Sequence, residues 1–226
     1  MLSRNRNGLA VPDLPLYEGT HLFDLVVAVA VGIATALLLA PVLTSARRLA
    51  RYGEARFAMP VLLLGGGLTV GLLALGGDAL GARSEDVLFS GQSSIPGLLA
   101  EDSTVIVLVL LLTKTFAYVV SLSCGFRGGP IFPAIFLGTG IATFAVVWFD
   151  MSPTVALAAG AAAGMAAQTR LLLASMLFAA LLVGSQGFDA IPATVLAAAA
   201  AWLAASALDR AITTPGTKCA ALETGR

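Results

Sequence analysis

The stretch SLSCGFRGGPIFPAIFLG, residues 121–138, interrupts two long apolar segments of the chain. Its glycines predict that one helix ends here, and Pro130 suits the first position of the next helix, where a missing N–H leaves no hydrogen bond unmade. The first turn of that helix would leave the amides of Gly129, Ile131 and Phe132 without partners. Beside the positive end of a helix dipole, such amides predict a site for a small anion. The same glycines are also compatible with a simple tight turn between helices.

Around this break the chain is more apolar than a soluble domain. Its 226 residues are 58% hydrophobic and 12% charged, whereas soluble domains are about half apolar and a quarter charged. A bilayer core about 30 Å thick needs roughly 20 apolar residues in a helix. Stretches of this kind are predicted at 25–43, 57–75, 105–122 and 131–149. The apolar run from 155 to 208 divides into helices at 155–167, 171–183 and 191–208, the first two too short to span a bilayer.

These patterns predict an all-α, multi-pass membrane protein with broken and half-spanning helices over residues 23–212. A polar N-terminal segment (1–22) and a polar C-terminal tail (213–226) flank it. The loop 44–57 holds four arginines against one acidic residue, and the loop 76–104 holds five acidic residues against one arginine. The positive-inside rule therefore predicts that the first loop is cytoplasmic and the second external, with the N-terminus external.

The charge balance and the scarcity of reactive side chains argue against several function classes. With 13 basic and 13 acidic residues, no basic field favours nucleic acid as a partner. His21 is the only histidine, and Cys124 and Cys219 are the only cysteines. We therefore expect no metal site, no cofactor, no catalytic residues and no enzymatic activity. The first twenty residues carry no signal-peptide pattern.

Two further features allow alternative interpretations. The small-residue pattern from Gly160 to Gly164 predicts close packing between membrane helices. Lys114 is the one charge in the segment 105–122, and an intramembrane charge is costly unless protein or water surrounds it. It could add positive potential to an anion pathway, or it could simply pair with backbone carbonyls or reach the interface.

The residues GGPIFPAIFLG resemble the Gly-x-Phe-x-Pro anion-binding motif of the CLC chloride channel and transporter family. Gly129, Ile131 and Pro133 occupy the three motif positions, and Gly138 closes the block. Lys114 resembles the basic residue that the preceding family helix often carries. The small-residue helix 159–167, the junction at Arg170 and the helix beginning at Ile191-Pro192 follow in family order. The resemblance covers about residues 14–212.

The resemblance implies a dimeric protein in which each subunit has an anion pathway made by two inverted repeats. This chain resembles the second repeat only, because it lacks the Gly-Ser-Gly-Ile-Pro and Gly-x-Glu-x-Pro motifs of the first. The gating glutamate of the latter motif is therefore absent. Ser94-Ile95-Pro96 is superficially similar to the former motif, but we interpret it as a turn in the external loop.

The chain departs from the family pattern at three positions, two of them in the motif. Pro130 lacks an N–H that the family usually provides, and Ile131 stands at the motif phenylalanine. The donor set should therefore shift toward Ile131 and Phe132. The pathway tyrosine of many members should fall near Thr213, beyond the last predicted helix, and no tyrosine is present there.

The resulting hypothesis is the C-terminal half of a CLC-type chloride channel or transporter in the cell membrane. Gly129, Ile131 and Phe132 would bind chloride or a similar anion through backbone amides, Gly128, Pro130 and Pro133 would shape the helix break, and Lys114 would contribute pathway electrostatics. Alone it should be inactive, needing a companion N-terminal half or a second copy. The alternatives are a non-conducting membrane scaffold or assembly subunit, and a truncated remnant.

Overall fold

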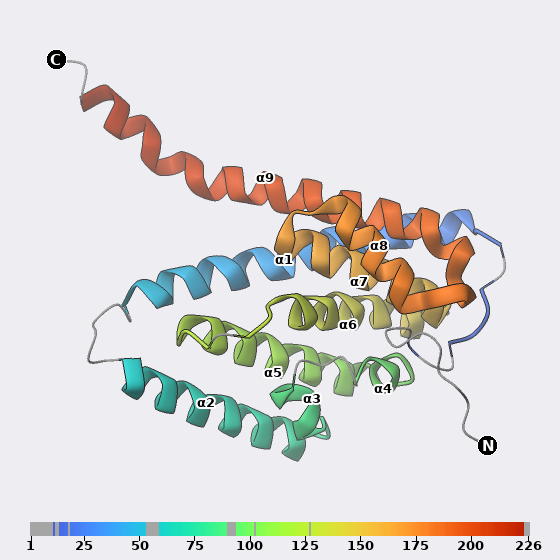
Figure 1. Cartoon of the computed structure of the whole chain (residues 1–226), viewed down its shortest axis with the longest axis horizontal. Coiled ribbons are helices and arrows are strands. Elements are labelled where there is room, and N and C mark those ends of the chain that lie inside the picture. Colours follow the sequence, from blue (N-terminus) through green and yellow to red (C-terminus); the bar gives the residue numbers. More distant parts are fainter. Residues whose placement is uncertain are drawn as a thin grey trace.

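The computed structural model describes residues 11, 14–17, 19–52, 59–89, 94–101, 103–126 and 128–223, and every regular element among them is helical. Five helices are long and apolar enough to cross a bilayer, which confirms an all-α multi-pass membrane protein (Figure 1). In chain order the elements are α1 (Leu22–Tyr52), α2 (Met59–Ala79), α3 (Ser84–Leu88), α4 (Ile95–Leu99), α5 (Thr104–Ser123), α6 (Ile131–Phe149), α7 (Pro153–Thr169), α8 (Leu172–Val183), the 3-10 helix η1 (Gly184–Ala190) and α9 (Ile191–Glu223).

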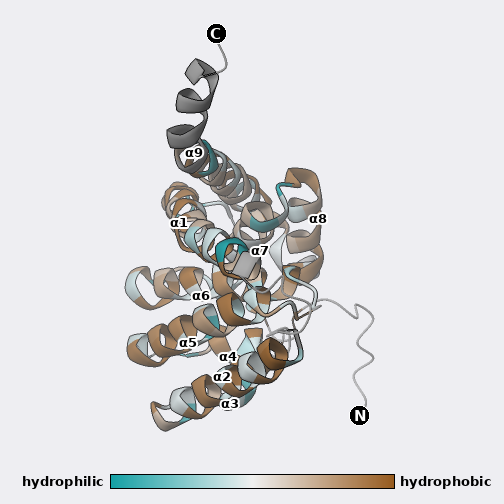
Figure 2. Cartoon of the chain, turned by 90° about the vertical axis from the view of Figure 1, so that its left-hand side faces the viewer, coloured by the Kyte–Doolittle hydropathy of each residue, from teal (hydrophilic) through white to brown (hydrophobic). Residues whose placement is uncertain are grey.

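Helix α7 lies at the centre of the molecule. Every residue from Thr154 to Ala167 is buried, and α1, α6, α8 and α9 all contact the helix. Figure 2 shows α7 enclosed among these four neighbours. Because it has no face toward lipid or water, its sequence carries no polar stripe. Its 17 residues are also too few to span a bilayer unaided.

Small residues bring the central helices into backbone contact. A Cβ placed on Gly138 of α6 would lie 2.2 Å from the carbonyl oxygen of Gly160, and one on Gly164 would lie 2.2 Å from the carbonyl oxygen of Ala134. Helices α1 and α9 meet similarly, since a Cβ on Gly32 would lie 2.5 Å from the oxygen of Ala197. The predicted packing role of the pattern at 160–164 is therefore confirmed.

The outer helices expose apolar side chains. Leu64, Leu68 and Leu72 of α2 are each at least 60% exposed, and Figure 2 shows hydrophobic residues over the outside of the bundle. In a soluble protein such a surface would aggregate, whereas a membrane-spanning helix presents it to lipid.

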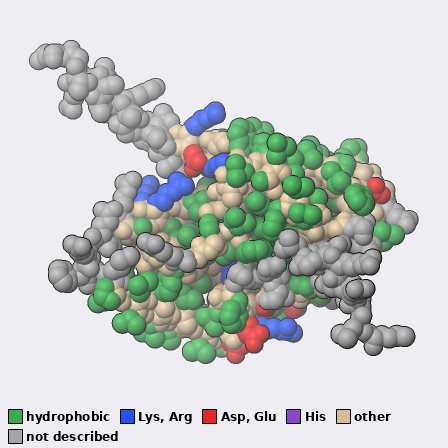
Figure 3. Space-filling view, viewed as in Figure 1, with side chains coloured by type: hydrophobic (Ala, Val, Ile, Leu, Met, Phe, Trp, Pro, Cys, Tyr) green, Lys and Arg blue, Asp and Glu red, His purple; other side chains and the backbone are tan. Residues whose placement is uncertain are grey.

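Charged side chains gather toward the ends of the helices. Figure 3 shows lysine and arginine side chains toward the upper left with an acidic side chain among them, and a mixed group of acidic and basic side chains at the lower edge. Arg47 and Arg48 lie exposed in the last turns of α1. This distribution is compatible with the orientation predicted from the loops, which stays a prediction.

Several predicted boundaries differ from the structure. Helix α6 spans the predicted 131–149, but α1 continues past the predicted end at 43 to Tyr52, and α9 continues past 208 to Glu223. An apolar stretch of sequence predicts only the part of a helix that faces lipid. The helix itself continues into polar sequence as long as its backbone hydrogen bonds are made. The predicted polar tail at 213–226 therefore continues α9 as far as Glu223.

The loop predicted at 76–104 contains two short helices, α3 and α4. Ser94-Ile95-Pro96 was interpreted as a turn, but Ile95 begins α4 with Pro96 in its first turn, a favourable position for proline. Ile95, Leu98 and Leu99 are buried, and α4 contacts α6. The segment is therefore a short helix held by its buried apolar side chains, and the prediction of a turn was wrong.

The polar N-terminal segment is attached to the helical bundle where it is described. The Val11 amide donates to the Leu182 carbonyl at 2.9 Å, and the Thr154 hydroxyl donates to the Pro15 carbonyl at 2.6 Å. The Gly19 amide donates to Asp189 Oδ2 at 3.0 Å. These bonds hold the start of α1 beside η1 and the facing ends of α7 and α8.

Candidate functional site

The break between α5 and α6 occupies residues 124–130, and its described residues after Cys124 are exposed. Helix α5 ends as the glycines predicted. The Cys124 amide donates to the Val120 carbonyl at 2.9 Å, and Gly125 has a φ of 77°, a left-handed conformation that glycine adopts without strain. Helix α2 supports the break from behind, because a Cβ on Gly66 would lie 2.6 Å from the Cys124 sulfur. Close contact with α2 therefore fixes where the break sits.

Helix α6 begins without a cap. Pro130 is its N-cap residue, one position before the predicted one, and it makes no side-chain capping hydrogen bond. Among the described residues, no group accepts a hydrogen bond from the amides of Gly129, Ile131 or Phe132. Pro133 lacks an N–H but lies in the first turn, where proline is tolerated. The three amides that the sequence singled out are therefore unpaired within the described chain, as orphan donors that a negative ligand could satisfy.

The start of α6 lies away from the ends of the longer helices. Figure 1 shows α6 beginning well inside the length of α1 and α2, between α5 and α7. Gly128, Gly129 and Pro130 are exposed, Ile131 and Phe132 are half-buried, and every residue from Ala134 to Gly140 is buried. The ring of Phe132 packs edge-on against Phe178 of α8 at 5.9 Å between centroids. That the start of α6 lies within a bilayer stays a prediction, which its placement along the bundle favours.

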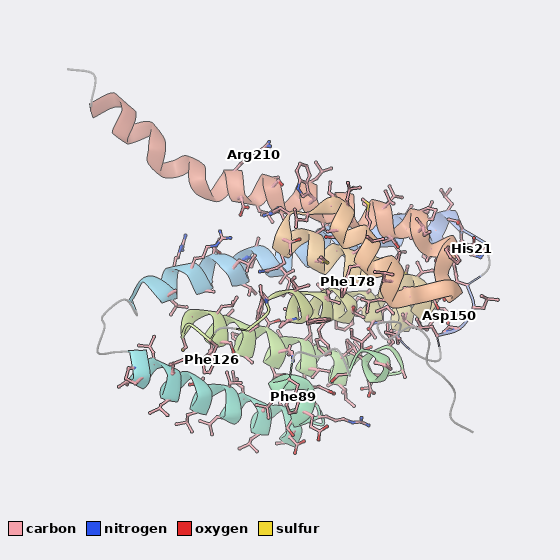
Figure 4. All side chains as sticks on the ribbon, viewed as in Figure 1. His21, Phe89, Phe126, Asp150, Phe178 and Arg210 are labelled. Atoms are coloured by element: carbon pink, nitrogen blue, oxygen red, sulfur yellow. The ribbon has the colours of Figure 1, made fainter. Side chains whose placement is uncertain are left out.

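A cavity of about 260 Å³ lies against the break. Its walls come from four parts of the chain: Val70 of α2, the end of α3 and the segment after it, one face of α5, and the break itself. Figure 4 shows Phe89, which follows α3, and Phe126, from the break, on the side of α5 that faces α2. On α5 the polar lining residues are Lys114, Tyr118 and Ser121, whose spacing places them on one helical face. The Tyr118 hydroxyl donates to the Pro130 carbonyl at 3.1 Å, which ties α5 to the start of α6.

Lys114 pairs with backbone carbonyls. Its side chain is 3% exposed, and Nζ donates to the carbonyls of Asp86 at 2.5 Å and Val87 at 3.2 Å, and also to that of Phe89. Nζ lies 5.1 Å from the ring centroid of Phe136 on α6. Of the two interpretations offered by the sequence, carbonyl pairing is the one observed. A contribution of the charge to an anion pathway stays a prediction.

A second polar cluster, which the sequence did not reveal, lies at the start of α1. The Tyr17 hydroxyl donates to Asp24 Oδ2 at 2.6 Å and accepts a bond from the His21 amide at 3.2 Å. Burial raises the pKa of Tyr17, and the bond to Asp24 raises it further. Figure 4 shows His21 and Asp150 at this same end of the bundle, away from Phe126. The buried Asp24 accepts a hydrogen bond from Tyr17, so the cluster anchors the start of α1. The same residues line an open hollow together with Phe149, Asp150 and Ser152.

Other residues singled out from the sequence contribute no site here. Among the described residues, no group of three or more histidine, cysteine or acidic side chains could hold a metal ion. The backbone of Thr213 and Cys219 continues α9, while their side chains lie outside the described ones. Arg170 ends α7 in a left-handed conformation with φ 63°, and its guanidinium bonds to the Ala205 carbonyl at 2.9 Å and to Asp209 at 2.6 Å. The predicted junction is thus a tie between α7 and α9.

Comparisons with known proteins agree on ion transport. The family model described as "Voltage gated chloride channel" matches residues 6–206. Proteins named "Putative ion-transport protein YfeO" from Escherichia coli (strain K12 / DH10B) and Shigella boydii serotype 18 are each 38% identical over 85 residues, covering 36% of this chain. The match covers 19% of the length of these curated relatives. No solved structure matches the chain. These names indicate a channel or transporter rather than an enzyme.

Proposed function

Because the chain belongs to the voltage gated chloride channel family, we propose that it supplies half of an anion pathway, with the amides of Gly129, Ile131 and Phe132 as ligands. Dehydrating a halide is costly, and N–H dipoles at a helix start can replace the lost water while still allowing release. The observation that carries the proposal is the uncapped start of α6, whose orphan amides have no acceptor in the described chain.

The surrounding residues support this proposal. Gly128 and Gly129 have no atom within 4 Å of an added Cβ, so the approach to the amides is open on this side. Pro130 and Pro133 carry no N–H, so the donors near the break are the amides of Gly129, Ile131 and Phe132, and the proline rings set the local backbone direction. Lys114 gives the same region a buried positive charge, although three carbonyls share it.

The rest of the pathway has to come from elsewhere. The chain contains no Gly-x-Glu-x-Pro segment, so it offers no glutamate in that motif context to act as a gate. A companion N-terminal half, or a second copy in the opposite orientation, would provide further donors. We therefore expect that liposomes in which every copy of this chain has the same orientation release chloride no faster than protein-free liposomes. Rapid chloride release by the chain in a single orientation would contradict the half-pathway proposal.

The anion site itself can be tested by removing a single N–H. Replacing Ile131 by its α-hydroxy acid converts the amide to an ester and keeps the side chain. We expect the chloride dissociation constant, measured by calorimetry, to rise at least about tenfold, because hydrogen bonds to a charged group contribute about 1.5–3 kcal/mol.

The matched control is the same backbone ester at Leu137, which lies in the buried interior of α6. It weakens the helix without touching the proposed site, so chloride binding should change little in folded protein. A membrane scaffold without an anion site, or a non-functional remnant, would show no chloride-dependent heat in any of the three proteins.

A further inference from the structure

The end of α3 and the residue that follows it are hydrogen-bonded to one buried side chain, that of Lys114. Helix α3 has five residues, Ser84–Leu88, so most of its carbonyls have no partner within the helix. The ammonium of Lys114 donates to three carbonyls at the end of α3, those of Asp86, Val87 and Phe89. An ammonium has three N–H donors, so this arrangement uses its full donor capacity.

Lys114 lies where three elements meet. It comes from the middle of α5, its acceptors belong to the end of α3, and the Phe136 ring of α6 lies 5.1 Å away. An ammonium placed over an aromatic ring is stabilised electrostatically. The residue is 3% exposed, so neither lipid nor water competes for these contacts. The lysine therefore fixes the α3 end relative to both α5 and α6.

The same α3 end forms a wall of the cavity at the break. Val87, Leu88 and Phe89 line the cavity on one side, and Tyr118 with Gly128–Pro130 lines it on another. Val87 is buried, whereas the side chains of Leu88 and Phe89 are 51% and 64% exposed. Those two side chains are more than half exposed, so the position of this wall depends on the burial of Val87 and on the hydrogen bonds to Lys114.

We propose that Lys114 is a positioning residue. By binding three carbonyls it holds residues 87–89 in place as the wall opposite Gly128–Pro130, and so keeps the space in front of the α6 amides at a fixed width. This inference rests on the proposed anion function, and it assigns Lys114 a role through its hydrogen bonds rather than through its charge. A neutral side chain that still donates hydrogen bonds should therefore replace it in part.

The experiment compares Lys114→Met with Lys114→Gln in the full chain. Methionine keeps the length and apolar stem but has no donor, while glutamine is equally neutral and keeps two N–H donors. Both variants are made with a nitroxide label on Leu88→Cys, after Cys124 and Cys219 are replaced by alanine. Mobility of the label is read by electron paramagnetic resonance, and chloride binding is read by calorimetry on the same samples.

We expect the label to be immobile with Lys114, mobile with Met and intermediate with Gln. The chloride dissociation constant should rise about tenfold for Met, which keeps none of the three donors, and about twofold for Gln, which keeps two and so loses about a third of the free energy. If Met and Gln weaken chloride binding equally while the label stays immobile in both, the charge alone acts and the proposal is overturned. A label that becomes mobile without any change in chloride binding overturns it as well.

The two readouts separate this inference from the anion function. If the Lys114 protein binds no chloride, the proposed function fails, and the positioning role in anion binding fails with it. In that outcome the label still shows whether Lys114 holds the wall. Should Lys114→Met not fold, Lys114 is compared with Lys114→Gln alone. A label of intermediate mobility with modestly weaker chloride binding in Gln supports the proposal, whereas an immobile label overturns it.

Discussion

The first turn of α6 and the turn that follows it are built in opposite ways. At Gly129 to Phe132 the backbone is open, and the amides of Gly129, Ile131 and Phe132 are unpaired within the described chain. At Ala134 and Gly138 the backbone lies directly against α7, so that neither Gly138 nor the facing Gly164 has room for an added methyl group. Only a few residues separate the two regions. A helix start can be left without a cap when the turn behind it is held rigidly, because the cost of the orphan amides is met by packing elsewhere. The tight contact between α6 and α7 thus holds the uncapped start of α6 in place.

The largest loss of stability is expected from disturbing the tight contact between α6 and α7. In Gly164→Ala the new Cβ would lie 2.2 Å from the backbone oxygen of Ala134, so α6 and α7 must move apart. We expect the free energy of unfolding to fall by about 3 kcal/mol and chloride binding to be lost with it. Denaturation by sodium dodecyl sulfate in micelles, followed by circular dichroism, measures the first quantity.

Gly65→Ala is the matched control for this substitution. It makes the same chemical change inside a helix, but an added Cβ there would meet nothing within 4 Å. Its stability should be unchanged or higher by up to about 1 kcal/mol, because alanine favours helix more than glycine does. Equal effects of the two substitutions would show that the α6–α7 crossing is not as tight as described.

A smaller effect is expected where α2 supports the open side. In Gly66→Ala the added Cβ would lie 2.9 Å from Cβ of Cys124 and 2.6 Å from its sulfur. The break would shift away from α2, lowering stability by about 1–2 kcal/mol and weakening chloride binding several-fold. Combining it with Cys124→Gly removes both clashing atoms, and the pair should recover part of the loss as a coupling between the two sites. If the double variant is simply additive, contact with α2 does not position the break.

The two regions also differ in how far they could be predicted from sequence. The bounds of α6 were predicted because the Gly-Gly-Pro step marks its start and the apolar run ends at Phe149, and the close packing at Gly160–Gly164 followed from residue size alone. The partners of Lys114 were not predictable, because they are backbone carbonyls more than twenty residues away in a loop whose acidic residues suggested only solvent exposure. Backbone acceptors leave no signature in the residue types that provide them. The anchor formed by Tyr17 and Asp24 was missed for a different reason, because it joins two side chains seven residues apart in a segment whose polar composition suggested no buried contact.

The smallest loss of stability is expected from removing one hydrogen bond at the uncapped start of α6 without changing its packing. Tyr118→Phe removes the hydroxyl that donates to the Pro130 carbonyl and keeps the ring. Loss of one hydrogen bond should lower stability by about 1 kcal/mol and raise the chloride dissociation constant about threefold, because Pro130 then moves more freely beside the amides.

Tyr17→Phe is the matched control, since it deletes the same hydroxyl from the bond to Asp24 at the start of α1. It should lower stability by a similar or larger amount, because a buried carboxylate loses its partner, while chloride binding stays unchanged. Titration calorimetry of both variants tests this difference directly. If Tyr17→Phe weakened chloride binding as much as Tyr118→Phe, the open end of α6 would depend on global stability and not on its local tie to α5.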